Sequence, residues 1–189
     1  MSADTIAEIL AEAKHKMDAA VEHTQGEFAK IRTGRANPQL VTDLPVSYYD
    51  TKVPLQQIAG VSVPEPRMLL INPYDQSALK EIERAIAASD LGINPSSDGQ
   101  VIRVVFPELT EERRKEFVRL ARERAEEGRV AIRNVRRHAK DRIESLGQKG
   151  EATEDEVHRA EKQLQDITDQ HTGRVDQLLE NKEHELLEV

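Results

Sequence analysis

The stretch Arg32-Thr33-Gly34-Arg35-Ala36-Asn37-Pro38 separates two kinds of sequence. Residues 1–31, which precede it, contain no proline, whereas residues 38–107 carry all eight prolines of the chain. Gly34 disfavours helix, and a residue that precedes proline, here Asn37, is pushed toward extended backbone. The stretch therefore predicts the end of a helix and the start of a separate module.

The segment before this break is predicted to be one long amphipathic helix. Its apolar residues recur at alternating steps of four and three, the pattern of a helix that packs against other helices. They are Ile6, Leu10, Ala13, Met17, Val21, Thr24, Phe28 and Ile31. Ser2 and Asp4 are candidate N-caps, because their side-chain oxygens can accept a hydrogen bond from a free N–H of the first turn.

The module after the break, residues 32–107, is predicted to be a small β/α/β domain. Runs rich in β-branched and other apolar residues predict strands at Val46–Tyr49, Leu55–Val63, Met68–Ile71 and Val101–Phe106. One amphipathic helix is predicted over Ser77–Ser89, with turns at Asn94-Pro95 and Ser97-Asp98-Gly99.

Two further long helices are predicted after this module. Thr110 is a candidate N-cap of the first, which ends near Gly147 and Gly150. Thr153 and Glu156 have the spacing of a capping box at the start of the second. The seam of the first comprises Phe117, Leu120, Ala121, Ala125, Gly128, Ile132, Val135, Ala139, Ile143 and Leu146, and that of the second Val157, Ala160, Leu164, Ile167, His171, Val175, Leu178 and Leu186.

Together these segments predict an α+β fold, in which a long three-helix antiparallel bundle carries a small β/α/β domain inserted between its first and second helices. The bundle domain comprises residues 1–31 and 108–189, and the inserted domain comprises residues 32–107. Because the chain leaves the bundle once and returns once, residues 32–38 and 107–110 form a candidate hinge of two chain segments.

Composition and motifs exclude several function classes. Aromatic residues make up 3% of the 189 residues and cysteine is absent, which removes thiol chemistry, disulfides and cysteine-ligated zinc. We find no phosphate-binding glycine loop, nucleophile elbow or zinc-protease motif, so we predict no catalytic residue, metal, cofactor or small-molecule substrate. His171 falls on an apolar seam, where we expect a hydrogen-bonded core histidine. The sequence has neither a targeting segment nor an apolar run of about 20 residues, so we expect a soluble, cytoplasmic protein without a membrane span.

Charge is distributed unevenly along the chain, although the formal net charge is −8. Residues 108–150 hold 13 Lys/Arg against 9 Asp/Glu, whereas residues 151–189 hold 4 against 12. On the helix predicted over the first of these segments, five cations fall within a narrow arc beside the apolar seam. They are Arg122, Arg129, Arg133, Arg136 and Lys140, and we call them the basic stripe.

The residues alone leave three interpretations of the basic stripe open. Between Arg129 and Arg142 there are six Lys/Arg and one acid, Asp141, so ion pairing within the helix is not expected and the stripe is compatible with an anionic partner. Guanidinium groups suit phosphate, and the scarcity of aromatics argues against base stacking, which favours RNA recognised by phosphate and shape. The alternatives are a solvated face that pairs with the acidic last helix, and a membrane surface.

Four segments, in order and at the right spacing, closely resemble the signature stretches of the bacterial ribosome recycling factor family. They are Lys30-Ile31-Arg32-Thr33-Gly34-Arg35-Ala36-Asn37-Pro38, Ala88-Ser89-Asp90-Leu91-Gly92-Ile93-Asn94-Pro95, Leu109-Thr110-Glu111-Glu112-Arg113-Arg114-Lys115 and Val130-Ala131-Ile132-Arg133-Asn134-Val135-Arg136-Arg137. The resemblance implies an L-shaped, tRNA-sized molecule, in which a flexible hinge joins a three-helix bundle to a β/α/β domain. It also implies a non-enzymatic factor that binds the large ribosomal subunit across the tRNA sites and, with elongation factor G and GTP hydrolysis, splits the ribosome after termination.

The resemblance also implies which residues contact ribosomal RNA. They are Arg32, at the end of the first helix, and Arg114, Arg133 and Arg136 on the second; Arg129 and Lys140 are added from the basic stripe. The expected hinge residues are Thr33, Gly34, Arg35, Pro38 and Pro107, and the factor is expected to act as a monomer. A competing class is a coiled-coil adaptor or chaperone, which would expose its apolar seams and show no salt-dependent association with ribosomes.

Overall fold

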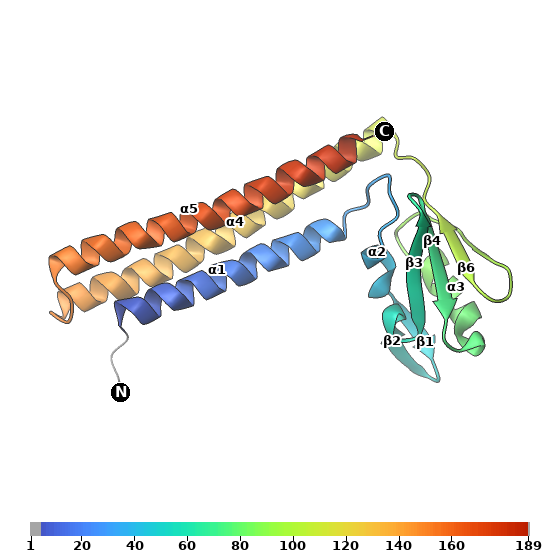
Figure 1. Cartoon of the computed structure of the whole chain (residues 1–189), viewed down its shortest axis with the longest axis horizontal. Coiled ribbons are helices and arrows are strands. Elements are labelled where there is room, and N and C mark those ends of the chain that lie inside the picture. Colours follow the sequence, from blue (N-terminus) through green and yellow to red (C-terminus); the bar gives the residue numbers. More distant parts are fainter. Residues whose placement is uncertain (1–4, 189) are drawn as a thin grey trace. The chain divides into compact units, whose positions relative to one another are not determined.

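Three long helices and a small antiparallel sheet make up the protein in the computed structural model, which describes residues 5–188 (Figure 1). The long helices are α1 (Ile6–Ala29), α4 (Glu111–Gln148) and α5 (Glu154–Leu187), and α4 runs antiparallel to the other two (Figure 1). The shorter elements all lie between α1 and α4 in the chain. The predicted α+β fold, a long helical bundle with an inserted sheet domain, is therefore confirmed.

The chain divides into two compact units. The first contains the described residues up to Phe28 together with Leu120–Glu183, and the second contains Ala29–Arg119 and the described residues from His184 onward. These boundaries differ from those expected from the sequence, since both candidate hinge segments, 32–38 and 107–110, lie within the second unit.

Thr5 caps the start of α1 through a pair of reciprocal hydrogen bonds. The backbone N–H of Thr5 donates to the Glu8 carboxylate at 3.0 Å, and the N–H of Glu8 donates to Thr5 Oγ1 at 3.2 Å. This arrangement is a capping box, which satisfies two backbone donors of the first turn. The candidate caps Ser2 and Asp4 lie outside the described residues.

The caps predicted for the other two long helices are confirmed. Thr110 Oγ1 accepts a hydrogen bond from the backbone N–H of Arg113 at 3.2 Å at the start of α4. Thr153 and Glu156 exchange bonds of 2.8 and 3.2 Å at the start of α5. Between these helices, Gly150 has a φ of 72°, a left-handed conformation that suits glycine after a helix end.

The predicted helical seams form the core of the first unit. The buried residues of α1 are Ile9, Ala13, Met17, Val21, Thr24 and Phe28, and those of α4 in this unit are Ala121, Ala125, Gly128, Ile132, Ala139, Ile143 and Leu146. The prediction was wrong in the first turn of α1, where Ile9 is fully buried but Ile6 and Leu10 are only half-buried. Ile9 stands one turn before Ala13 and so continues the same face. The seams are covered, which counts against an adaptor that exposes them.

The second unit is built on a four-stranded antiparallel sheet with the strand order β3-β4-β6-β5, beside a separate β1-β2 hairpin. The strands are β1 (Pro45–Tyr48), β2 (Thr51–Pro54), β3 (Ala59–Glu65), β4 (Met68–Pro73), β5 (Pro95–Ser97) and β6 (Ile102–Val105). Helix α3 (Leu79–Ala87) packs against β1 and β5, and shorter turns form α2 (Gln39–Thr42), η1 (Leu55–Gln57) and η2 (Gln76–Ala78).

Three details of this unit differ from the sequence prediction. The segment Leu55–Val63 is not one strand, because it begins as the 3-10 turn η1 and enters β3 only at Ala59. Strand β5 forms at Pro95–Ser97, where turns were predicted. Strand β2 and helix α2 were not predicted at all, and each is only four residues long.

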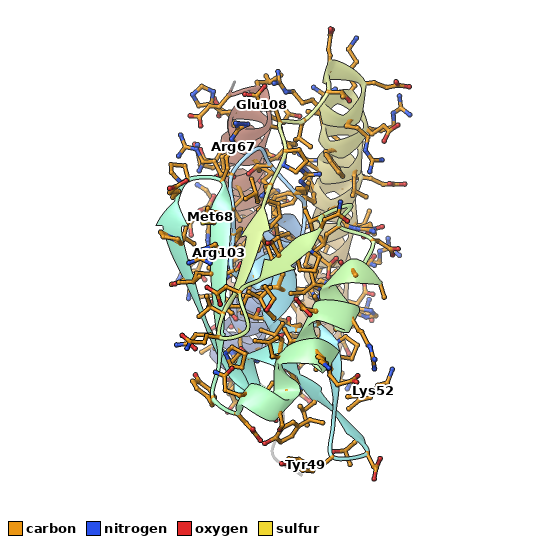
Figure 2. The ribbon with its side chains drawn as sticks, turned by 90° about the vertical axis from the view of Figure 1, so that its right-hand side faces the viewer. Tyr49, Lys52, Arg67, Met68, Arg103 and Glu108 are labelled. Atoms are coloured by element: carbon orange, nitrogen blue, oxygen red, sulfur yellow. The ribbon has the colours of Figure 1, made fainter. Side chains whose placement is uncertain are left out.

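One face of the sheet carries the core of the second unit and the other is open. Leu69 and Ile71 of β4 are fully buried, and so are Ile102 and Val104 of β6. The intervening residues face outward, among them Met68 and Arg103 (Figure 2). At the end of the sheet Arg67 forms a 3.1 Å salt bridge with Glu108, and Tyr49 marks the tip of the β1-β2 hairpin (Figure 2).

Candidate nucleic-acid interface

The basic stripe lies along α4, beside the buried seam of the first unit. Helical geometry places its cations at the edge of the core, so that each stem packs against apolar residues while the charged head reaches solvent. The side chains of Arg133 and Lys140 are 49% and 43% exposed, whereas that of Arg129 is 24% exposed.

The part of the stripe that includes Arg122 and Arg129 is neutralised by α5. The Nε of Arg122 lies 2.6 Å from the Glu183 carboxylate, and a terminal nitrogen of Arg129 lies 2.7 Å from Asp176. Burial alone would lower the pKa of Arg129, but its hydrogen bonds to Asp176 and Glu126 outweigh that effect and raise the pKa. These two arginines therefore fit the interpretation of a face paired with the acidic last helix.

The next part of the stripe pairs within its own helix. Arg133 donates to Glu126 at 2.6 Å, and this bond is the main reason that the pKa of Glu126 is lowered. Lys140 lies 3.4 Å from Glu144. The expectation that acids are missing around the stripe was wrong, because Glu126 precedes residues 129–142 and Glu144 follows them.

Arg136 is the exception in the stripe. Its side chain is half-buried, and within residues 5–188 it has no salt bridge and no side-chain hydrogen bond. A guanidinium group without a counterion at the edge of a core favours an anionic partner, since its charge is partly desolvated and not compensated.

Arg32, which the resemblance implied as an RNA contact, is buried within the second unit. The residue is only 9% exposed. Its Nη2 donates to the backbone carbonyl of Pro107 at 2.7 Å, and its guanidinium lies 5.6 Å from the centre of the Phe106 ring. Burial, and then the nearby charge of Arg113, lower the pKa of Arg32. In this conformation Arg32 ties together the two candidate hinge segments, both of which lie in the second unit.

Arg114, the remaining expected RNA contact, lies near the start of α4. Its side chain is half-buried and makes no salt bridge within the described part of the chain. Arg114 lines a pocket whose other walls include Glu108 and Glu188 of the same unit. These two carboxylates form salt bridges with Arg67 and Arg35, which also line the pocket, so Arg114 has both basic and acidic neighbours there.

The candidate hinge residues are held in different ways. Thr33 is buried, and its hydroxyl accepts a hydrogen bond from the backbone N–H of Arg35 at 3.2 Å. The Arg35 side chain lies 3.0 Å from Glu188. Pro38 precedes α2, and Gly34 has open space around the position of a Cβ.

His171 is a core histidine, as expected. It is 2% exposed, and its two ring nitrogens lie 2.7 Å from the Ile167 carbonyl and 2.7 Å from Asp18 of α1. The hydrogen bond from His171 is the largest cause of the lowered pKa of Asp18, which also pairs with Lys14 and Arg174. This cluster holds α5 against α1.

The rest of the described chain shows neither of two other kinds of site. Within residues 5–188, no three His, Cys, Asp or Glu side chains are grouped to hold a metal ion. In the same residues no helix combines enough length with enough apolar character to cross a membrane.

The structure also reveals basic residues that the sequence argument missed. His158 and Lys162 stand one turn apart on α5 and line the same groove as Arg136 and Lys140 of the stripe. Their spacing of four residues was visible in the sequence. The twelve acids of residues 151–189 outnumber their four Lys/Arg, so the charge count alone indicates an acidic helix there.

Comparisons with a family model, with curated proteins and with solved structures all match this chain to the same family. The family model described as ribosome recycling factor matches residues 24–187. The ribosome-recycling factors of Thermobifida fusca and Beutenbergia cavernae are 54% and 55% identical to this chain over 184 residues, covering 97% of it and all of each relative. A solution structure of a ribosome recycling factor is 44% identical, with a TM-score of 0.78 over 98% of this chain and 99% of the other. A Thermus thermophilus ribosome recycling factor, in a structure with Escherichia coli elongation factor G on the post-termination complex, is 49% identical, with a TM-score of 0.70 over 98% of this chain and all of the other.

Proposed function

The chain belongs to the ribosome recycling factor family, and on that premise we propose that it binds the post-termination ribosome and, with elongation factor G and GTP hydrolysis, promotes its dissociation into subunits. It acts without catalysing a reaction itself, in the cytoplasm where the ribosomes are, and as a monomer. Its partners are the RNA of the large subunit and the GTPase.

The observation that carries this proposal is Arg136. It is the member of the basic stripe without a counterion among the described residues, whereas Arg122 and Arg129 are neutralised by α5. Ribosomal RNA supplies a dense array of phosphates, which suit an arginine fork. Arg133 joins Arg136 by exchanging its bond to Glu126 for a phosphate, and Arg114 and Lys140 lie on the same helix. Arg32 and Arg129 belong to the proposed RNA-binding set only if their bonds to Pro107 and Asp176 are likewise exchanged for phosphate.

The two units have different roles in the proposed mechanism. The bundle fixes the factor on the large subunit, and the inserted domain receives force from elongation factor G. Thr33, Gly34, Arg35, Pro38 and Pro107 form the proposed hinge through which that domain responds. The factor supplies position and rigidity, while GTP hydrolysis by its partner supplies the free energy. The acids of α5 repel the protein from RNA surfaces that do not match, which sets its orientation.

Subunit dissociation followed by light scattering tests this proposal. Post-termination ribosomes are mixed with elongation factor G and GTP, with and without the protein, and the expected result is faster dissociation in its presence. A second arm without GTP should show no acceleration. An unchanged rate in the complete reaction would refute the proposed function.

Arg136→Ala tests the observation on which the proposal rests. Loss of a charge-assisted hydrogen bond costs about 1.5–3 kcal/mol, so binding to large subunits should weaken roughly 10- to 100-fold. Helicity and unfolding should change little, because Arg136 has no partner within the described residues. Arg137→Ala is the matched control, since Arg137 is an exposed arginine at the next position of α4. Equal losses in the two variants would show that general charge, not Arg136, governs docking.

A further inference from the structure

A groove lies on the first unit between the carboxyl-terminal half of α4 and the amino-terminal half of α5. Its volume is about 570 Å³ and its lining residues are Arg136, Lys140, His158, Glu161, Lys162, Leu164 and Gln165. Leu164 is 2% exposed and belongs to the core, so the groove lies directly over packed residues of the bundle. The walls are therefore held by the same contacts that hold the helices together.

Basic side chains line both walls of this groove. Arg136 and Lys140 stand one helical turn apart on α4, and His158 and Lys162 stand one turn apart on α5. Glu161 is the acid among the lining residues, and Lys140 has a salt bridge to Glu144 outside the lining. Within residues 5–188, neither Arg136 nor Lys162 has a salt bridge, and His158 has no hydrogen-bond partner.

This arrangement is unfavourable for the protein alone. Residues 151–189 carry twelve acids and four Lys/Arg, and Arg174 is paired with Asp18. Lys162 instead lines the same groove as Arg136, where like charges repel. An anion in the groove would offset this repulsion, because it would attract both Lys162 and Arg136. The groove therefore has the charge of a binding site for an anion.

We propose that this groove binds the sugar–phosphate backbone of RNA, with Lys162 and His158 of α5 acting as binding residues alongside Arg136 and Lys140. The inference rests on the proposed function and deepens it, because it extends the RNA-binding surface from α4 to the helix that carries most of the acids. In this assignment α5 has two roles, which are to neutralise Arg122 and Arg129 and to supply Lys162 and His158 beside Arg136.

The lining residues favour a phosphate backbone over other occupants. None of the described residues that line the groove is aromatic, so they offer no platform for base stacking. Leu164 is the sole apolar lining residue and is buried, so the groove offers little apolar surface to a protein partner. Arginine and lysine at helical spacing match a backbone that presents a negative charge at every nucleotide.

Binding to large ribosomal subunits at several salt concentrations tests the proposal, using Lys162→Ala, His158→Ala and the control Lys149→Ala. Lys162, His158 and Lys149 are all exposed, so their removal should leave the circular dichroism spectrum unchanged. Lys149 makes no salt bridge in the described part of the chain and does not line the groove. Each variant therefore removes one side chain without disturbing the core.

The expected signature is a change in salt dependence. Removal of one phosphate contact lowers the slope of log affinity against log salt by about 0.7–0.9, so the advantage of the natural chain over Lys162→Ala should shrink about threefold between 50 and 200 mM salt. Lys149→Ala should keep the full slope. An equal change of slope in Lys149→Ala and Lys162→Ala would overturn the proposal, because it would indicate a general charge effect.

A chemical probe identifies the occupant directly. The chain contains no cysteine, so Gln165→Cys provides a single attachment point at the groove for an iron chelate that cleaves nearby RNA backbone. We expect cuts in large-subunit RNA from position 165. An absence of RNA cuts from a variant that still binds subunits would overturn the proposal and indicate a protein contact.

The failure of this inference is distinguishable from that of the proposed function. If Arg136→Ala weakens binding while Lys162→Ala and His158→Ala behave like Lys149→Ala, the role of α5 is refuted and the docking surface is confined to α4. If the natural chain does not accelerate subunit dissociation, the proposed function itself is refuted.

Discussion

Gly128→Ala tests whether a close approach of α1 and α4 fixes the geometry of the bundle. Gly128 lies in the middle of α4 and is buried against Thr24 of α1. A Cβ added at Gly128 would lie 2.3 Å from Thr24 Oγ1 and 3.4 Å from both Thr24 Cβ and Cγ2. Rotation of the Thr24 side chain would move its hydroxyl away from the Ala20 carbonyl, to which it donates a hydrogen bond of 2.9 Å, and Thr24 is only 2% exposed.

Whether Gly128→Ala raises or lowers the stability of the protein depends on two opposing contributions. Alanine is favoured over glycine within a helix by about 1 kcal/mol. Inserting atoms into a packed core costs about 1–3 kcal/mol, and an overlap of this size belongs at the upper end of that range. The net result is a loss of roughly 2 kcal/mol, which lowers the melting temperature of a chain of this length by about 4–8 °C.

The assay is urea and thermal unfolding followed by circular dichroism, with two matched controls and one rescue. Gly26→Ala and Gly173→Ala place the same methyl group in α1 and α5, where nothing lies within 4 Å, so both should stabilise the protein. Thr24→Ala removes the obstructing atoms, so adding Gly128→Ala to it should cause no further loss. If Gly128→Ala is as stabilising as Gly26→Ala, the reasoning about this contact is refuted.

Three further predictions concern other parts of the molecule. The hydrogen bond from Arg142 is the main reason that the pKa of Glu12 falls from 4.5 to about 2. The Glu12–Arg142 pair therefore contributes to the free energy of unfolding above pH 4.5, and this contribution is lost as the pH falls toward 2. Glu12→Gln should therefore weaken the pH dependence of unfolding over that range, and an unchanged dependence would count against the pair. Arg32→Ala should lower the stability of the second unit by about 2 kcal/mol in urea unfolding, because it removes the bond to Pro107; reduced RNA binding at unchanged stability would contradict this structural role. Gly34→Pro should leave binding to large subunits intact but slow light-scattering dissociation, and an unimpaired rate would contradict the proposed hinge.

Features that depend on local chemistry could be predicted from the sequence. The caps at Thr110 and Thr153 are confirmed because a capping hydrogen bond joins residues three apart, so the pattern contains both partners. The seams are confirmed because helical periodicity repeats over many turns. Strands β2 and β5 are only four and three residues long, so neither has enough residues to show a period.

Features that depend on distant partners could not be predicted in the same way. Pairing of the basic stripe with the acidic last helix was one of three open interpretations, but the individual pairs Arg129–Asp176 and Arg122–Glu183 join residues 47 and 61 positions apart. Which acid faces which arginine depends on the rotation of α5 about its axis, and a count of charges does not contain that information. The burial of Arg32 was missed for a related reason, since Pro107 is 75 residues away in the chain.

The net charge of −8 and the proposed binding of RNA are compatible because α5 distributes its charge unevenly. Its acids neutralise Arg122 and Arg129, while Lys162 and His158 lie in the groove beside Arg136. Neutralisation therefore removes the stripe's charge in one part of the bundle and leaves it available in another. Since each cation at a phosphate contributes separately to salt dependence, docking through the few remaining cations should show a shallow salt slope, well below that expected if every basic residue of α4 were engaged.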